Sequence, residues 1–206
     1  MKVKTDYYWG FAVIFMVVLL FFQKKDFENK IAQKISKTEF EKHIETDRVR
    51  NNNDLNREFL QFSSSNKKIN TSIALERENG KTIQLKDLLD SEYKLIFNFT
   101  DINCNSCITQ EVENIKKFTD SMGIKRIVLL ANYRLSRDLI VFKRMNNLRV
   151  DVYNTNNQKL GLKVEEYNLP YYFIANNEGE TKQVFIPEKE RPNLSAKYYE
   201  VISGVF

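Results

Sequence analysis

The amino-acid sequence predicts an α/β domain over residues 71–206, folded as a three-layer α/β/α sandwich. From Ile73 onward, segments with the residue pattern of strands alternate with segments that have the pattern of helices. Two apolar runs, 94–99 and 126–131, have the composition of strands that are buried on both faces. This part of the chain is long enough to enclose a core of its own.

The domain is expected to open with a β-hairpin. Asn79-Gly80 is a strong turn signal, and it lies between β-prone runs at 72–77 and 82–84. Residues 85–89 follow with the pattern of a helical turn.

The centre of the domain is expected to be strand, helix and strand. The run 94–99 predicts a buried strand, and 126–131 predicts a second. Between them, Val112, Ile115 and Phe118 form an apolar stripe at helical spacing, which predicts a helix from Ile108 to Met122.

The remaining elements complete the alternation. The sequence predicts a helix at 135–145, a strand at 149–153 and a second hairpin formed by 171–175 and 181–186. A final helix is expected to be capped by Asn193 or Ser195 and to end near residue 203.

Cys104 and Cys107 are the two cysteines of the chain, and Asn105 and Ser106 separate them. They stand between a predicted strand and a predicted helix. A helix N-terminus offers unpaired N–H groups and the positive end of the helix dipole, and both favour a thiolate over a thiol. This spacing and placement is typical of dithiol–disulfide redox chemistry.

Two other roles for the pair are less favoured. A zinc site needs four ligands, and the one histidine, His43, lies in a polar stretch far from the cysteines in sequence. A purely structural disulfide would close a very short loop, so it would stabilise the fold little. The sequence therefore favours redox chemistry, with a non-catalytic disulfide as the alternative, and predicts no cofactor and no metal.

Residues 1–22 are predicted to be an uncleaved signal-anchor. The stretch from Tyr7 to Phe22 carries no charge, its aromatic start suits a membrane interface, and no small residues typical of a cleavage site follow it. Lys2 and Lys4 favour a cytoplasmic N-terminus. The expected location is the inner membrane of a bacterium, single-pass, with the domain in the periplasm, where disulfides form.

Residues 23–70 are expected to be a helical connector. Thr38 to Glu41 has the pattern of a capping box, and Asn51 to Asp54 is expected to interrupt the helical pattern. Leu55, Phe59 and Phe62 form an apolar stripe expected to pack on the domain or on a partner chain. Most of the net charge of +5 belongs to the anchor and connector, and the nearly neutral domain argues against nucleic acid as a partner.

From residue 72 onward the chain resembles the thioredoxin superfamily. Within it, the resemblance is to the membrane-anchored, TlpA-like thiol–disulfide oxidoreductases, with a redoxin (AhpC/TSA-like) domain. Three segments carry this resemblance: the leading hairpin 78–88, the strand, redox loop and helix start 98–107, and the stretch 167–174 followed by Asn177 to Gly179.

The resemblance implies a mechanism and a substrate surface. Pro170 would be a cis-proline within van der Waals reach of the Cys104 sulfur, and Leu169 and Pro170 would help to bind the substrate. Cys104, at the exposed strand end, would attack a substrate disulfide, and Cys107 would resolve the mixed disulfide. Partners would be proteins with disulfides or dithiols, together with a redox partner that the sequence does not identify.

The chain departs from the family pattern at several positions. Thr100 and Asn103 stand where aromatic residues are usual, and Asn105-Ser106 stands where a proline is common. These differences affect the surface around the cysteines.

The proton carrier is open as well. Asn98 stands where many thioredoxins have a buried acid, although the TlpA-like branch is similar in having asparagine there. The candidate proton carriers are Glu165, Glu166 and Asp151. The favoured interpretation is that each is a solvated surface charge and carries no proton in the reaction.

Two rival functions remain. A peroxidase of the peroxiredoxin type needs a threonine and a proline at set positions before the attacking cysteine, where this chain has Asp101 and Ile96. An anchored binding module with an idle disulfide is the rival from a different class.

Overall fold

The structure is a computed structural model of the chain. It describes residues 44–90, 92–103 and 105–206 and the single residues 25, 34, 38, 39, 41 and 42, and for residues 105–107 it describes only the backbone. The chain divides into two compact units, Met1–Leu55 and Asn56–Phe206. Residues 56–70, which the sequence analysis assigned to the connector, therefore belong to the unit that contains the α/β domain.

The predicted signal-anchor, residues 1–22, lies outside the described residues. Within the part of the chain that the structure describes, no helix combines the length and the apolar composition needed to cross a bilayer. The anchor stays a prediction.

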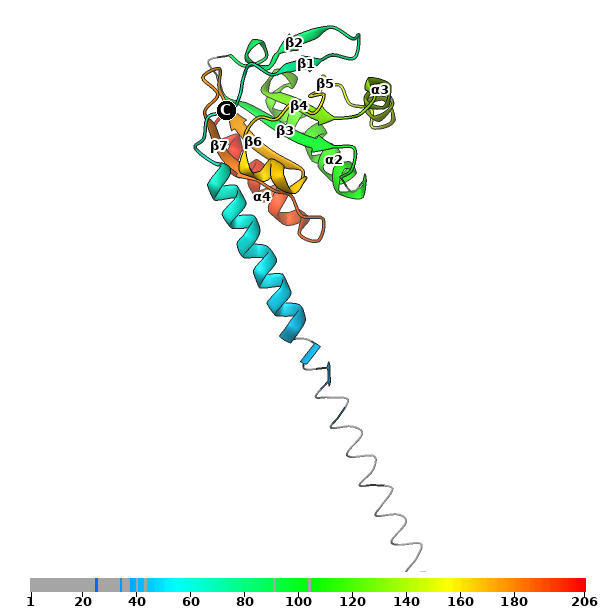
Figure 1. The fold of residues 1–206 in the computed structure, drawn as a ribbon, viewed down its shortest axis with the longest axis vertical. Helices are drawn as coiled ribbons and strands as arrows, with labels where there is room; N and C mark the ends of the chain where they lie inside the picture. Colours follow the sequence, from blue (N-terminus) through cyan, green and yellow to red (C-terminus); the bar gives the residue numbers. More distant parts are fainter. Residues whose placement is uncertain are drawn as a thin grey trace, which may run out of the picture. The chain divides into compact units, whose positions relative to one another are not determined.

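The second unit is built on a seven-stranded sheet with the order β2-β1-β5-β4-β3-β6-β7 (Figure 1). Its central pairs, β3–β4 and β4–β5, are parallel, and the remaining pairs are antiparallel. The strands are β1 (Ala74–Glu76), β2 (Thr82–Gln84), β3 (Lys94–Thr100), β4 (Ile127–Asn132), β5 (Val152–Asn154), β6 (Tyr171–Ala175) and β7 (Thr181–Phe185).

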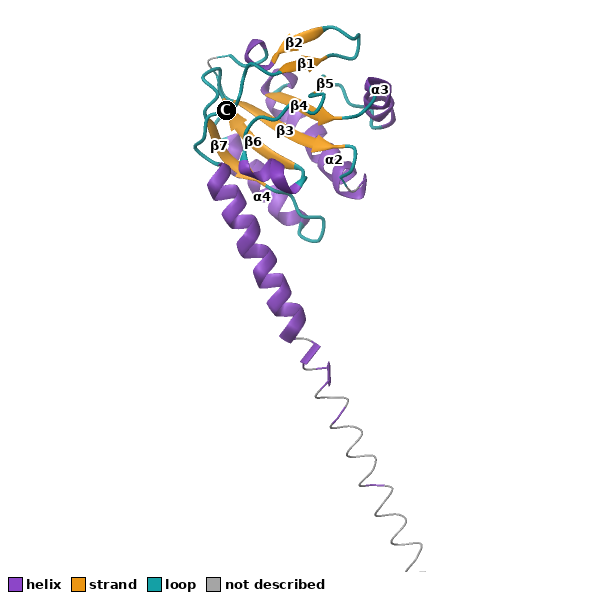
Figure 2. Ribbon diagram, viewed as in Figure 1, coloured by secondary structure: helices purple, strands orange, loops and turns teal. Residues whose placement is uncertain are grey.

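α-Helices follow β3, β4 and β7, and a 3₁₀ turn lies between β5 and β6 (Figure 2). The α-helices are α2 (Asn105–Met122), α3 (Ser136–Met145) and α4 (Pro192–Ser203), and the 3₁₀ turns are η1 (Leu85–Asp87), η2 (Ile124–Arg126) and η3 (Lys163–Tyr167). The predicted α/β class is confirmed.

Two hydrophobic cores lie on opposite faces of the sheet. Successive side chains of a strand point to opposite faces, so β3 contributes to both cores. Phe97 packs in a core with residues of α2, α3 and α4. Ile96 packs in the other core with Leu60, Leu85 and Val164, which come from the helical residues 56–64, η1 and η3. The sheet is therefore covered on both faces, as the three-layer sandwich requires.

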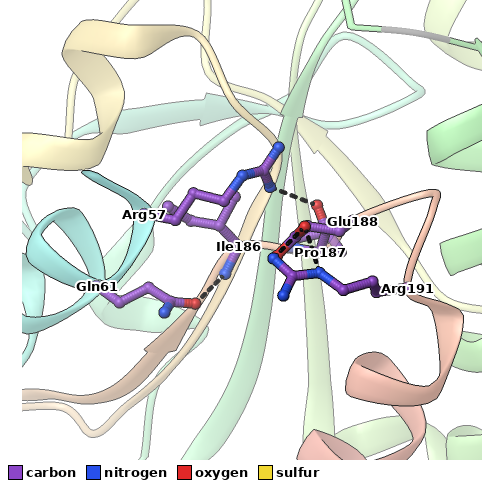
Figure 3. Close-up of polar contacts among 6 residues, drawn as sticks. All are labelled: Arg57, Gln61, Ile186, Pro187, Glu188 and Arg191. Carbon is purple, nitrogen blue, oxygen red and sulfur yellow. Dashed lines mark hydrogen bonds and ion pairs between the residues drawn. The ribbon is translucent and has the colours of Figure 1, made fainter. Parts of the chain in front are cut away.

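The helical residues 56–64 are attached to the segment between β7 and α4. The Arg57 guanidinium donates to the Pro187 carbonyl at 3.3 Å, and the Gln61 side-chain oxygen accepts from the Ile186 N–H at 2.8 Å (Figure 3). An ion pair between Glu188 and Arg191 shapes the same segment (Figure 3).

The face of this helix that packs on the domain is not the predicted one. Leu60 is only 4% exposed, whereas Phe59 and Phe62 are 61% and 83% exposed. The expectation that these two phenylalanines pack on the domain is therefore wrong. The alternative, that they contact a partner chain, stays a prediction.

Three expected helix boundaries are also wrong. Asn51 to Asp54 are helical like the residues on either side, because Asn and Asp cost at most about 0.7 kcal/mol each relative to alanine and no glycine or proline intervenes. Thr38 is helical, and its hydroxyl donates to the Lys34 carbonyl at 2.9 Å. Helix α4 begins at Pro192 after the N-cap Arg191, because the first helical turn tolerates a residue without an N–H.

Candidate functional site

The redox segment, residues 100–107, runs from a strand end into a helix. β3 ends at Thr100, a turn covers Asp101 to Asn103, and α2 begins at Asn105. Cys107 therefore belongs to the first turn of α2, and the position of Cys104 at the strand end stays a prediction. Cys104 itself and the side chain of Cys107 lie outside the described residues, so their exposure and acidity stay predictions.

Asn103 connects the redox segment to the loop before β6. Its side chain is buried, with the residue 9% exposed. The side-chain oxygen accepts from the Thr100 N–H at 2.7 Å, and the side-chain nitrogen donates to the Asn168 carbonyl at 2.6 Å. One amide group therefore shapes the turn before Cys104 and holds it against the segment that leads to Pro170.

Pro170 lies in a trans peptide, because no cis peptide bond occurs among the described residues. The expectation that the bond from Leu169 to Pro170 is cis is therefore wrong. Asn168 turns the chain instead, in the left-handed conformation with φ of 51°, and trans is the default state of a bond before proline. A cis-proline can no longer support a catalytic role for this site.

Leu169 and Pro170 nevertheless lie close to the redox segment. Tyr171 pairs with Asn98 across the antiparallel strands β6 and β3, so the two residues before Tyr171 lie beside the end of β3 that leads to the cysteines. Pro170 is buried and Leu169 is half-buried.

Asn98 is bonded to the first residue of β6. Its side-chain nitrogen donates to the Tyr171 hydroxyl oxygen at 2.7 Å. Burial raises the pKa of Tyr171 well above its usual value, and the nearby charge of Glu165 raises this pKa further. Tyr171 is therefore a neutral phenol at physiological pH, and Asn98, as an amide, cannot carry a proton.

The three candidate proton carriers have different surroundings. Glu165 accepts hydrogen bonds from three consecutive backbone N–H groups, residues 160–162, at 2.8 to 3.1 Å. It is therefore not a solvated surface charge but the group that holds this loop. Glu166 pairs with Lys163 at 2.6 Å, and the side chain of Asp151 is 69% exposed. Both residues are therefore consistent with solvated surface charges.

Glu111, on α2, was not identified from the sequence. It is 2% exposed and accepts hydrogen bonds from the Ser195 hydroxyl at 2.8 Å and from the Tyr172 hydroxyl at 3.0 Å. Its position on the same helix face as Val112 and Ile115 is the signal that could have indicated a buried carboxylate. The structure places it one helical turn after Cys107.

A polar cavity of about 220 Å³ lies beside the redox segment. Its lining comes from the carboxyl ends of β3 and β4, from the residues after β5 and from the loop before β6, and includes Asn98, Thr100, Asn132, Thr155, Asn157 and Asn168. Thr100 also carries a buried hydroxyl that has no hydrogen-bond partner in the described part of the chain. No sequence pattern indicated this cavity.

Metal-ligating residues do not gather in the described ranges: no group of three or more His, Cys, Asp or Glu side chains there could hold a metal ion.

Comparison with known proteins gives a fold but no close relative. No family model matches the chain, and no curated protein matches it.

Solved structures share the fold. A PrxQ mutant from Xylella fastidiosa is similar with a TM-score of 0.52 and 8% identity, over 68% of this chain and 95% of that one. A thiol:disulfide interchange protein from Bacteroides sp. is similar with a TM-score of 0.50 and 15% identity, over 67% of this chain and 92% of that one. The second unit therefore has a mixed α/β, thioredoxin-like fold.

Proposed function

We propose that the chain is a thiol–disulfide oxidoreductase that exchanges disulfides with protein substrates through Cys104 and Cys107. The observation that carries the proposal is the position of the Cys-x-x-Cys pair, between the end of β3 and the first turn of α2, in a thioredoxin-like fold. The structure of a protein described as a thiol:disulfide interchange protein has the same fold, which supports the proposal.

The chemistry is a two-electron exchange. The Cys104 thiolate attacks one sulfur of a substrate disulfide, a mixed disulfide forms, and the other substrate sulfur leaves as a thiolate. The Cys107 thiolate then attacks the Cys104 sulfur, which closes the Cys104–Cys107 disulfide and releases the reduced substrate. The N-terminus of α2 favours the attacking thiolate through its unpaired N–H groups and its dipole.

The substrate segment would bind next to Leu169 and Pro170. This position follows from the pairing of β6 with β3 and from the hydrogen bond of Asn103 to the Asn168 carbonyl. Both features hold the loop before β6 at the redox segment without a cis-proline.

The test is turnover of a generic protein disulfide. Purified full-length protein in detergent is given insulin and a small dithiol reductant, and precipitation of the reduced insulin chain is followed. Wild-type protein should accelerate the reaction, while Cys104→Ser and Cys107→Ser should not. A wild-type rate equal to that of the reductant alone would favour the binding module with an idle disulfide.

A parallel assay addresses the peroxidase. Consumption of hydrogen peroxide by the reduced protein is compared with its turnover of insulin. Rapid consumption of peroxide with no reduction of insulin would replace the proposed function by peroxidase activity.

We further propose that residues 1–22 anchor the protein in the inner membrane with the domain in the periplasm. The support is the uncharged stretch from Tyr7 to Phe22 and the absence of small residues after it. Membrane fractionation combined with N-terminal sequencing tests the anchor. A soluble product that begins near residue 24 would refute it.

A further inference from the structure

The polar cavity lies where the ligand of an open α/β sheet is expected. Such ligands bind outside the carboxyl ends of the parallel strands. At the cavity, Thr100 and Asn132 are the last residues of β3 and β4, and Thr155 directly follows β5. The loop residues Asn168 and Leu169 line it as well. The cavity therefore adjoins both parts of the proposed redox site, the segment before the cysteines and the loop before β6.

Hydrogen-bonding groups dominate its walls. Among the described residues that line the cavity, Phe99 and Leu169 have side chains without a polar group. The other side chains carry amide, hydroxyl or charged groups. The Asn98 side-chain nitrogen is used by Tyr171 at 2.7 Å. The Thr100 hydroxyl is buried without a partner among the described residues, and an unpartnered buried polar group carries a desolvation cost that calls for an explanation.

The wall of the cavity is fixed relative to the cysteines. Asn103 holds the Asn168 carbonyl at 2.6 Å and the Thr100 N–H at 2.7 Å, so both sides of the cavity are bound to the residue before Cys104. Thr100 and Asn103 are also the two positions at which the resembled family usually has aromatic rings. Small polar side chains in place of rings leave this part of the surface polar.

The volume limits what the cavity can hold. At roughly 30 Å³ for each water molecule, a cavity of about 220 Å³ has room for about seven waters, which is the size of one or two side chains. Sites for drug-sized ligands or cofactors usually have about 300–1,000 Å³. The cavity therefore has the size of a substrate side chain and is smaller than the usual site for a nucleotide or a flavin.

We propose that the polar cavity is a substrate subsite that receives a polar, hydrogen-bonding side chain next to the reactive cysteine of a protein disulfide. This inference rests on the proposed function, since it concerns the same site. The Asn98 amide would bond to that side chain directly, and the Thr100 hydroxyl, which is covered in the empty cavity, would bond to it after a small shift of the wall. A protein with an apolar neighbour beside its cysteine would be the poorer substrate.

Two synthetic peptides test the subsite. Each contains one cysteine in a mixed disulfide with nitrothiobenzoate, and they differ only in the two residues that flank this cysteine, Asn in one peptide and Leu in the other. The Cys104 thiolate of pre-reduced full-length protein attacks the peptide sulfur, and coloured nitrothiobenzoate leaves as a thiolate. Cys107 then attacks the Cys104 sulfur and releases the peptide thiol, so the burst of colour measures the first step.

Wild-type protein should react with the Asn peptide about threefold to tenfold faster than with the Leu peptide, the range expected for one or two hydrogen bonds. Thr100→Val should lower the rate with the Asn peptide relative to the rate with the Leu peptide, so that the preference is lost. Thr82→Val, on β2 and outside the cavity, is the matched control and should keep the full preference. The urea midpoints of both variants show that they are folded.

Equal wild-type rates with the two peptides, both well above the rate of free cysteine, would overturn the subsite and leave the proposed function standing. A preference that Thr100→Val retains would also overturn the subsite. Rates no faster than those of free cysteine with either peptide would refute the proposed function together with the subsite.

Discussion

Replacing Asn103 by alanine removes both hydrogen bonds that hold the turn before Cys104. The side-chain oxygen no longer accepts from the Thr100 N–H, and the side-chain nitrogen no longer donates to the Asn168 carbonyl. The structure therefore predicts a loss of stability and a loss of alignment between the redox segment and the loop before β6.

The expected magnitude follows from the two bonds. Each contributes about 1 kcal/mol net, so Asn103→Ala should lower the free energy of unfolding by about 2 kcal/mol. The loss rises to about 3 kcal/mol if the Thr100 N–H stays without a partner. With a urea dependence of about 2 kcal/mol/M, this loss shifts the urea midpoint by roughly 1 M or slightly more.

Urea unfolding followed by circular dichroism measures the shift, and Asn168→Gly is the matched control. The Asn168 group that accepts from Asn103 is its backbone carbonyl, and glycine adopts a positive φ as readily as asparagine. This variant should keep the midpoint within about 0.5 M of wild type. The rate with peptide disulfides should also fall for Asn103→Ala.

The reasoning is refuted if Asn103→Ala unfolds at the wild-type midpoint, or if Asn168→Gly loses as much stability as Asn103→Ala. The first result would show that the two bonds contribute no net stability. The second would show that the stability depends on the side chain or the backbone conformation of residue 168, and not on its hydrogen bond with Asn103.

Three further predictions follow from buried groups. Glu111→Ala should lower the free energy of unfolding by about 2–4 kcal/mol, because it leaves the buried Tyr172 and Ser195 hydroxyls without their acceptor; in the same urea assay, the exposed Glu113→Ala should cost under about 1 kcal/mol, and equal losses would contradict this account. Thr100→Val should leave the urea midpoint unchanged or raise it, because the hydroxyl that it removes has no partner within the described ranges, and a loss above about 1 kcal/mol would show that the hydroxyl is bonded. Burial, together with the charges of Asp101 and Asp138, raises the pKa of Tyr133 to about 12; the unfolded chain releases this proton near pH 10 and the folded chain does not, so the contribution of Tyr133 to stability should be constant below about pH 10 and should fall as the pH rises toward 12. Urea midpoints and phenolate absorbance across that range check the prediction, and native tyrosines that all titrate near pH 10 would contradict it.

Elements whose own residues determine their structure were predictable from the sequence. β3 and β4 are continuous apolar runs because both of their faces are buried, and such a run is visible without knowing its neighbours. The apolar stripe of α2 is equally local. The first residue of α4 was missed because a proline at the start of a helix removes the need for a capping side chain, and the helical state of Asn51 to Asp54 was missed because asparagine only weakly opposes a helix.

Contacts of the site were harder to predict because they join distant residues. Asn103 and Asn168 are 65 positions apart in the chain, and Glu111 and Ser195 are 84 positions apart. No local sequence pattern indicates that either pair is in contact. The trans state of Pro170 was missed for a different reason: the expectation of a cis bond came from the resemblance alone, and the left-handed residue that turns the chain is Asn168.

The most direct test of thiol–disulfide exchange is to trap its intermediate. Full-length Cys107→Ser lacks the resolving thiol, so reaction of the reduced variant with an oxidised protein substrate should accumulate a mixed disulfide, and peptide mass spectrometry should locate it at Cys104. Cys104→Ser should accumulate none. The account is contradicted if Cys107→Ser forms no mixed disulfide, or if Cys104→Ser forms one at Cys107 equally fast.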